Sequence, residues 1–168
     1  MNFIVRKEKP GDIESIETVT IQAFLNAQHT DHTEQFIVRA LRKSDAMTIS
    51  LVAVAQEQVI GHVAVSPVTI SDGARGWFGL GPISVMPDQQ RPGIGSQLMC
   101  RALEELQNLG ASGCVVLGNP AYYSRFGFKP ESTLVLPGVP SEYFQAILFG
   151  DSLPQGQVVY HAAFNAKG

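Results

Sequence analysis

Two glycines separated by one residue, Gly93 and Gly95, stand between a short apolar run and a stretch with helical character. Glycine lets the backbone approach a ligand closely, and the first amides of a helix have no intrahelical acceptor. The helix dipole favours negative charge at the same end. Residues 80–98 therefore predict an anion-binding loop, and a phosphate-bearing ligand is the expected occupant.

The elements on either side of this loop must position it. The apolar run 80–85 predicts a strand, and the helix is expected from about Ser96 to Gly110. The buried face of that helix carries apolar residues at helical spacing, namely Leu98, Ala102, Leu103 and Leu106. The apolar run 113–117 predicts a strand parallel to 80–85, joined to it by a right-handed crossover.

The remaining segments predict an α+β fold with a mixed sheet. Helices are expected from Ile13 to about Asn26 and, capped by Asp31 or Thr33, to about Ser44. Strands are expected at 2–7, 47–56, 59–70, 76–85, 128–136 and 158–164. The three successive runs before the glycine loop indicate an antiparallel meander. A short helix is expected at 141–148.

The composition restricts the class of protein. The chain has 168 residues, of which 45% are hydrophobic and 16% charged, with a net charge of −3, so a single globular domain spanning 1–168 is expected. No Lys/Arg run suggests nucleic-acid binding, and no apolar run approaches the ~18 residues of a membrane span. Without a signal-peptide pattern, a cytoplasmic location is expected. Cys100 and Cys114 fit neither a disulfide framework nor a metal site, and both are expected to be buried.

Two common phosphate-binding motifs do not fit the loop. A P-loop requires Lys followed by Ser or Thr after its second glycine, whereas Gly95 is followed by Ser96 and Gln97. A dinucleotide fingerprint requires a third glycine where this chain has Leu98. A nucleotide-binding α/β domain is therefore a weak alternative.

A third pattern fits better. The loop reads Gln90-Arg91-Pro92-Gly93-Ile94-Gly95, which resembles the Gln/Arg-x-x-Gly-x-Gly/Ala signature of the GNAT superfamily of acetyl-CoA-dependent N-acetyltransferases. Tyr123-Ser124-Arg125-Phe126-Gly127-Phe128 resembles the Tyr-x-x-x-Gly-Phe element of the same family. Segments 80–85 and 117–123 are similar to its YhbS-like branch. The resemblance covers most of the chain and implies the GNAT fold, an antiparallel N-terminal meander with a central splayed parallel strand pair.

The resemblance also implies site residues. The cofactor would be held by the signature residues Gln90, Arg91, Pro92, Gly93, Ile94, Gly95 and Ser96. Among them, Arg91, Gly93, Ile94, Gly95 and Ser96 would give backbone amides to the CoA pyrophosphate. Backbone groups of Ile83 and Val85 would pair with the pantetheine arm, and an amide near Ile83 or Ser84 would polarise the thioester carbonyl. A bulge at Pro82 would splay the strands.

The tyrosine of the second motif has its own implied role. Tyr123 would contact the cofactor and protonate the departing thiolate as general acid. Many family members carry an asparagine where this chain has Val116, and Asn119 either replaces it or is a turn residue before Pro120.

The expected activity is direct transfer of an acetyl group from acetyl-CoA to a primary amine, without a metal. The amine could belong to a small molecule or a peptide, and the sequence does not identify it. The general base is also open, with His29, His32, Glu34 and His62 as candidates. A non-catalytic CoA-binding or sensing module on the same fold is the alternative. Dimers are common in the family, and the oligomeric state is open.

Overall fold

A computed structural model describes residues 2–27, 30–89 and 93–168. The strands are β1 Ile4–Lys7, β2 Ile49–Ala55, β3 Gln58–Ile70, β4 Trp77–Val85, β5 Gly113–Leu117, β6 Leu134–Val135, β7 Phe144–Leu148 and β8 Gly156–Tyr160. The α-helices are α1 Ile13–Phe24, α2 Glu34–Lys43, α3 Ile94–Asn108 and α4 Pro120–Tyr123. Short 3₁₀ segments are η1 Pro10–Asp12, η2 Pro87–Gln89, η3 Ser124–Phe126, η4 Ser141–Tyr143 and η5 Ala162–Asn165.

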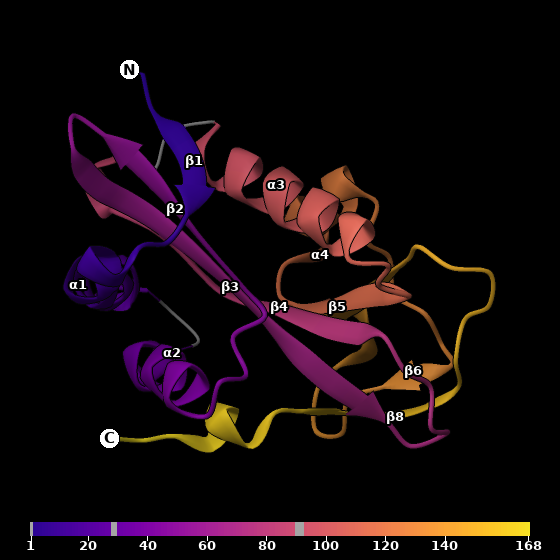
Figure 1. Cartoon of the computed structure of the whole chain (residues 1–168). Helices are drawn as coiled ribbons and strands as arrows, with labels where there is room; N and C mark the ends of the chain where they lie inside the picture. The colour runs from indigo at the N-terminus through magenta and orange to yellow at the C-terminus, as the bar shows by residue number, and fades with distance from the viewer. Residues whose placement is uncertain (1, 28–29, 90–92) are drawn as a thin grey trace.

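The sheet is mixed, as predicted. Its main path runs β1-β2-β3-β4-β5-β7, and β8 pairs with both β3 and β6. The first four strands of this path are antiparallel neighbours, and β4 and β5 are parallel. Helix α3 makes the crossover between that parallel pair (Figure 1). The N-terminal meander and the central parallel pair are thereby confirmed.

Helices cover both faces of the sheet. Helix α3, with α4 nearby, lies on one face, and α1 and α2 lie on the other (Figure 1). Side chains along β2 alternate between the two faces, as a strand requires. Leu51 and Ala53 pack in the core under α3, while Val52 packs against Ile16 of α1 and Val38 of α2. The buried face of α3 consists of Ile94, Leu98, Met99, Ala102, Leu103 and Leu106.

Two predictions for the C-terminal third are wrong. Segment 141–148 is not a helix, because after η4 it forms β7, which pairs antiparallel with β5. This pairing provides hydrogen-bond partners for the backbone groups along the outer edge of β5. The spacing of apolar residues within 141–148 does not indicate such a long-range pairing. Segment 128–136 contains only the two-residue β6 and an isolated bridge between Lys129 and Ala146.

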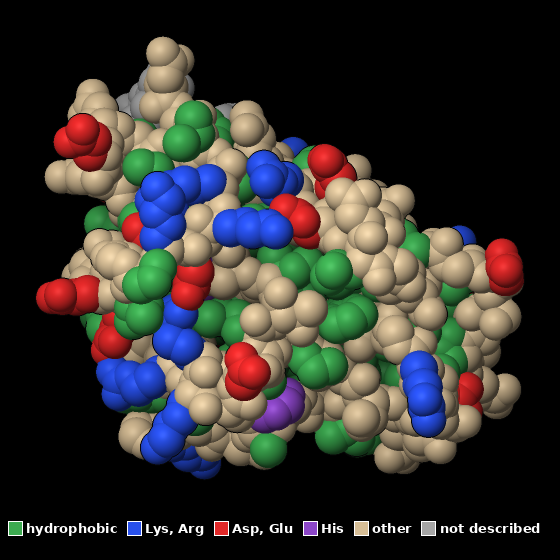
Figure 2. All heavy atoms as spheres, viewed as in Figure 1, with side chains coloured by type: hydrophobic (Ala, Val, Ile, Leu, Met, Phe, Trp, Pro, Cys, Tyr) green, Lys and Arg blue, Asp and Glu red, His purple; other side chains and the backbone are tan. Residues whose placement is uncertain are grey.

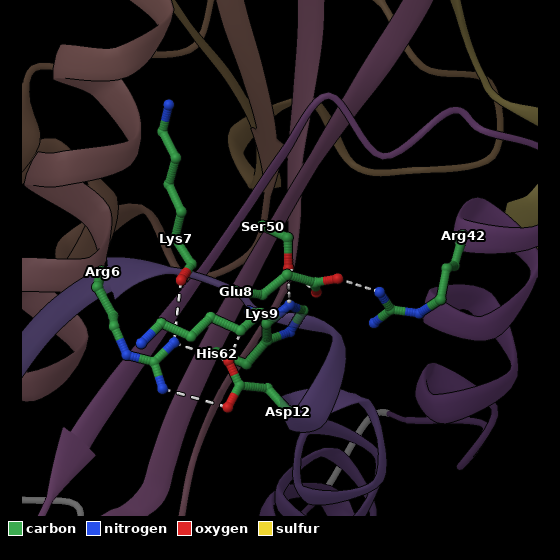
Figure 3. A network of polar contacts seen from close by, with 8 residues as sticks. All are labelled: Arg6, Lys7, Glu8, Lys9, Asp12, Arg42, Ser50 and His62. Atoms are coloured by element: carbon green, nitrogen blue, oxygen red, sulfur yellow. Dashed lines mark hydrogen bonds and ion pairs between the residues drawn. The ribbon is translucent and has the colours of Figure 1, made fainter.

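A polar network joins the end of β1, α2 and the β2–β3 hairpin (Figure 3). Glu8 forms an ion pair with Arg42 and accepts a hydrogen bond from Ser50 Oγ. Because that hydroxyl donates to Glu8, it accepts from His62 Nε2, 2.8 Å away. His62 is fully buried, and its Nδ1 has no partner among the described residues. Burial lowers the pKa of His62 to about 4, so the ring is neutral at pH 7.

The surface carries charges of both signs. On the face in Figure 2, Lys and Arg are interspersed with Asp and Glu rather than forming a field of one sign. Within residues 2–27, 30–89 and 93–168, no helix is long and apolar enough to cross a membrane. Cys114 is buried as expected, but Cys100 is exposed, because it lies outside the buried face of α3.

Candidate active site

The parallel strands β4 and β5 are paired over only three residues. Trp77, Phe78 and Gly79 pair with Gly113, Cys114 and Val115. Beyond Gly79, β4 continues to Val85 and β5 to Leu117 without a further described pair between them. On the other side of β4, Val65 is opposite Leu80 but Val63 is opposite Ile83, which places one extra residue at Gly81–Pro82. The end of the β4–β5 pairing after Gly79 confirms the predicted splay, and the bulge between β3 and β4 lies at the predicted Pro82.

A cavity of about 370 Å³ opens where the strands separate. Its lining comes from both splayed strands, from the helices α1 and α2, and from the C-terminal segment. The lining residues are Phe24, Glu34, Ile37, Leu80, Gly81, Pro82, Ile83, Leu117, Tyr123, Leu136, Tyr160 and Phe164. Most of these residues are apolar. The ionisable side chains among them are the carboxylate of Glu34 and the phenols of Tyr123 and Tyr160.

Two glycines make room for the two tyrosine rings of the cavity. A Cβ at Gly79, the last paired residue of β4, would lie 2.7 Å from Cε2 of Tyr160. A Cβ at Gly118, directly after β5, would lie 2.6 Å from Cε2 of Tyr123. Real Cβ atoms are not found so close to a ring carbon, since interiors are already close-packed. The chain therefore places an aromatic ring against each splayed strand.

Tyr123 is the last residue of α4, and its ring is largely withdrawn from solvent. The ring packs edge-on against Tyr122 and Phe128, with centroids 5.0 and 6.0 Å away. Burial, followed by the neighbouring Tyr122, raises the pKa of Tyr123 to about 12. A phenol in this state holds its proton at neutral pH and is therefore available as a proton donor in the cavity.

Tyr160, the last residue of β8, is a second phenol that sequence reasoning missed. Its hydroxyl is buried and has no hydrogen-bond partner among the described residues. Burial raises its pKa, with smaller contributions from Cys114 and Tyr123. One sequence signal could have indicated a close neighbour here, because Gly79 interrupts an otherwise bulky strand and such glycines often mark the approach of another group.

Glu34 is the first residue of α2 and the one carboxylate among the described residues that line the cavity. Thr30 donates a hydrogen bond from Oγ1 to Glu34 Oε2. The other oxygen, Oε1, is buried and has no partner among the described residues. A carboxylate also suits the N-terminus of a helix electrostatically.

The other candidates for a general base lie elsewhere. His62 belongs to the buried network of Glu8 and Ser50 and does not line the cavity. His32 is exposed, with a φ of 57°, and does not line it either. His29 lies outside the described residues. Of the candidates whose positions are described, Glu34 alone faces the splay.

Helix α3 begins at the predicted glycine loop, and anion binding there stays a prediction. Gly93 is the N-cap with a φ of 118°, a conformation that favours glycine. Gln97 N donates to Gly93 O at 2.9 Å, so the amides of Ile94, Gly95 and Ser96 precede the first intrahelical bond. Gln90, Arg91 and Pro92 lie outside the described residues.

A cationic side chain that sequence reasoning did not select lies over this end of α3. Arg125 Nη2 donates to Ser96 Oγ at 3.4 Å. Its guanidinium stacks 5.3 Å from the ring centre of Tyr122. A Cβ at Gly95 would lie 3.0 Å from the Tyr122 hydroxyl, so glycine at this position lets the phenol approach the helix start.

The remaining predicted cofactor residues are placed as follows. Ile83 lines the cavity, whereas Ser84, opposite His62 in the sheet, is 2% exposed and directs no side chain into it. Val85 is the last residue of β4, and its pairing with a pantetheine arm stays a prediction. The side chain of Asn119 accepts a hydrogen bond from Ala121 N at 2.9 Å and caps α4. This bond supports the turn interpretation, and a cofactor contact for Asn119 stays a prediction.

Comparison with known proteins places this geometry in a family. A model of the acetyltransferase (GNAT) domain matches residues 48–130. Over 97% of its length, the chain is 35% identical to the uncharacterized N-acetyltransferase YhbS of Escherichia coli K12, of which it covers 99%. The chain belongs to the GNAT family of acetyltransferases.

Solved GNAT structures share the whole fold. A GNAT family acetyltransferase from Brucella melitensis, crystallised with acetyl-CoA, is 46% identical, with a TM-score of 0.87 over 97% of this chain and 98% of that one. E. coli YhbS in complex with CoA is 33% identical, with a TM-score of 0.90 over 100% of this chain and 94% of that one. In the described part of this GNAT chain, no cluster of three or more His, Cys, Asp or Glu could hold a metal ion.

Proposed function

We propose that this protein, acting as one domain over residues 1–168, transfers the acetyl group of acetyl-CoA directly to a primary amine. Membership of the GNAT family and the near full-length similarity to proteins crystallised with acetyl-CoA or CoA support the donor. The observation that carries the proposal is the splay, in which β4 and β5 separate after Gly79 and Val115. The protonated phenol of Tyr123 lies beside this opening.

The described residues fit an acyl-CoA along this opening. The amides at the start of α3 and the guanidinium of Arg125 would hold phosphate oxygens. The β4 backbone at Ile83 would pair with the amide groups of the pantetheine arm in the manner of an added strand. The thioester would then lie at the cavity, beside the bulge at Gly81–Pro82.

The reaction would be a direct acyl transfer that passes through a tetrahedral intermediate. The amine nitrogen forms a bond to the thioester carbonyl carbon, and the carbon–sulfur bond breaks. Tyr123, which holds its proton at neutral pH, would give that proton to the departing thiolate as the carbon–sulfur bond breaks. Water is limited by the apolar lining, so hydrolysis of the thioester would compete poorly.

Calorimetry with acetyl-CoA, ATP and NAD tests the donor. We expect a one-to-one complex with acetyl-CoA and no comparable heat with the two nucleotides. Release of free thiol in the presence of a mixture of amines then tests turnover. Binding without thiol release would favour the alternative of a CoA-binding or sensing module, and binding of ATP or NAD instead would reject the proposal.

A further inference from the structure

We propose that the acceptor is a small primary monoamine with an apolar body, and that Glu34 binds its ammonium group. This inference rests on the proposed acetyl transfer and adds to it the class of the second substrate. Three features of the splay cavity carry it: the single carboxylate in its described lining, the apolar character of the rest of that lining, and its volume.

The arrangement of Glu34 suits a cation. Thr30 fixes one carboxylate oxygen, and the other is buried with no partner among the described residues. A buried carboxylate oxygen without a partner is costly, and an ammonium group would supply the missing donor. Because α1, α2 and the splayed strands all contribute lining, an ammonium at Glu34 lies in the same cavity as Tyr123.

The charged groups of the described lining disfavour amino acids and polyamines as acceptors. The described lining contains no Lys or Arg to receive a carboxylate, so an amino acid would bring an unpaired anion beside Glu34. It contains no second acidic residue to receive another ammonium, so a polyamine would leave at least one charge unpaired in apolar surroundings. A monoamine satisfies the site with one ion pair.

The aromatic residues that line the cavity indicate the kind of group that the amine carries. Phe24 and Phe164 come from α1 and η5, and the Tyr160 ring lies between β4 and the C-terminal segment. These rings favour an aromatic or aliphatic group. The cavity volume of about 370 Å³ lies near the lower end of the ~300–1,000 Å³ of small-molecule sites, and it must also admit the acetyl group.

Glu34 would also balance the protons of the reaction. Its carboxylate takes one proton from the bound ammonium, which frees the nitrogen lone pair to attack the carbonyl carbon. The carbon–nitrogen bond forms, the carbon–sulfur bond breaks, and the thiolate receives the proton of Tyr123. The second amine proton restores the phenol, and Glu34 releases the first to solvent, so one proton leaves for each amide formed.

A panel of acceptors with the unmodified protein and acetyl-CoA tests the class. Thiol release would be measured with phenethylamine, phenylalanine, spermidine and Nα-acetyl-lysine amide. We expect kcat/KM for phenethylamine to exceed that for phenylalanine and spermidine by about 100-fold or more, since each of these leaves a charge unpaired. Preference for phenylalanine, spermidine or the lysine derivative would overturn the inference.

A pair of matched variants tests Glu34. Glu34→Gln keeps the size and one hydrogen-bonding oxygen but removes the charge. Asp31→Asn removes a charge from an exposed residue of the same segment that does not line the cavity. We expect Glu34→Gln to lower kcat/KM for phenethylamine by at least about 30-fold, through KM because the ion pair is lost and through kcat because the proton acceptor is lost. Asp31→Asn should match the unmodified protein.

Calorimetric titration with acetyl-CoA separates failure of the inference from failure of the proposed function. If Glu34→Gln binds acetyl-CoA normally and keeps full activity with phenethylamine, the role of Glu34 is wrong and acetyl transfer stands. If the unmodified protein does not bind acetyl-CoA, the proposed function itself fails. The acceptor panel uses only the unmodified protein, so poor folding of a variant does not affect it.

Discussion

Acidification should destabilise the protein through His62. The ring is fully buried, and burial lowers its pKa from 6.5 to about 4 in the folded chain, with Glu8 opposing the shift and Arg42 adding to it. The unfolded chain therefore binds the proton more readily than the folded chain between these two values. The stabilisation is complete above pH 6.5 and is lost as the pH falls toward 4. At about 1.4 kcal/mol per pH unit, the loss amounts to about 3 kcal/mol.

Urea unfolding at several pH values measures this loss. Trp77 is the one tryptophan of the sequence and is 2% exposed, so its fluorescence reports unfolding. We expect the free energy of unfolding to fall most steeply near pH 5. Replacing His62 with Gln supplies the control, because the variant should lack this part of the slope. Equal slopes for both proteins between pH 6.5 and 4.5 would refute the reasoning.

Three further outcomes follow from the packing. Gly79→Ala should lower the unfolding free energy by about 1–3 kcal/mol in urea titrations, because the new methyl group meets the Tyr160 ring, and an unchanged midpoint would contradict that contact. In Gly93→Ala the new methyl group meets no atom within 4 Å, so the expected loss of about 1–2 kcal/mol in unfolding free energy comes from the φ of 118° alone. The same variant should bind acetyl-CoA more weakly in calorimetry. A thiol reagent should titrate one cysteine in the folded protein, Cys100, and both after unfolding; early reaction of the buried Cys114 would argue against this core.

Local signals in the sequence were sufficient for the central part of the fold. The strand before the loop, the glycines at 93 and 95, and the apolar spacing of Leu98, Ala102 and Leu106 each depend on residues close together in the chain. The predicted helix began two residues late, since Ile94 already belongs to α3. Tyr123 could be selected because its motif follows β5 directly.

Long-range packing determined what the sequence did not reveal. Segment 144–148 has an apolar run too short to distinguish a helix from a strand, and pairing with β5 decides it. Tyr160 reaches the cavity only because β8 pairs with β3, a contact between residues about ninety positions apart. The sequence left Glu34 as one of four candidates for the base, and the fold singles it out because Glu34 lines the splay cavity and its Oε1 has no partner among the described residues.

Comparison of acetyl-CoA binding and turnover in Tyr123→Phe tests the central proposal most directly. Tyr122→Phe is the matched control, because the two rings are adjacent and only Tyr123 lines the cavity. We predict that Tyr123→Phe keeps the acetyl-CoA affinity of the unmodified protein but loses about 100-fold or more in kcat, while Tyr122→Phe keeps its kcat. Full turnover of Tyr123→Phe at every pH would contradict the assignment of Tyr123 as the acid that releases the thiol.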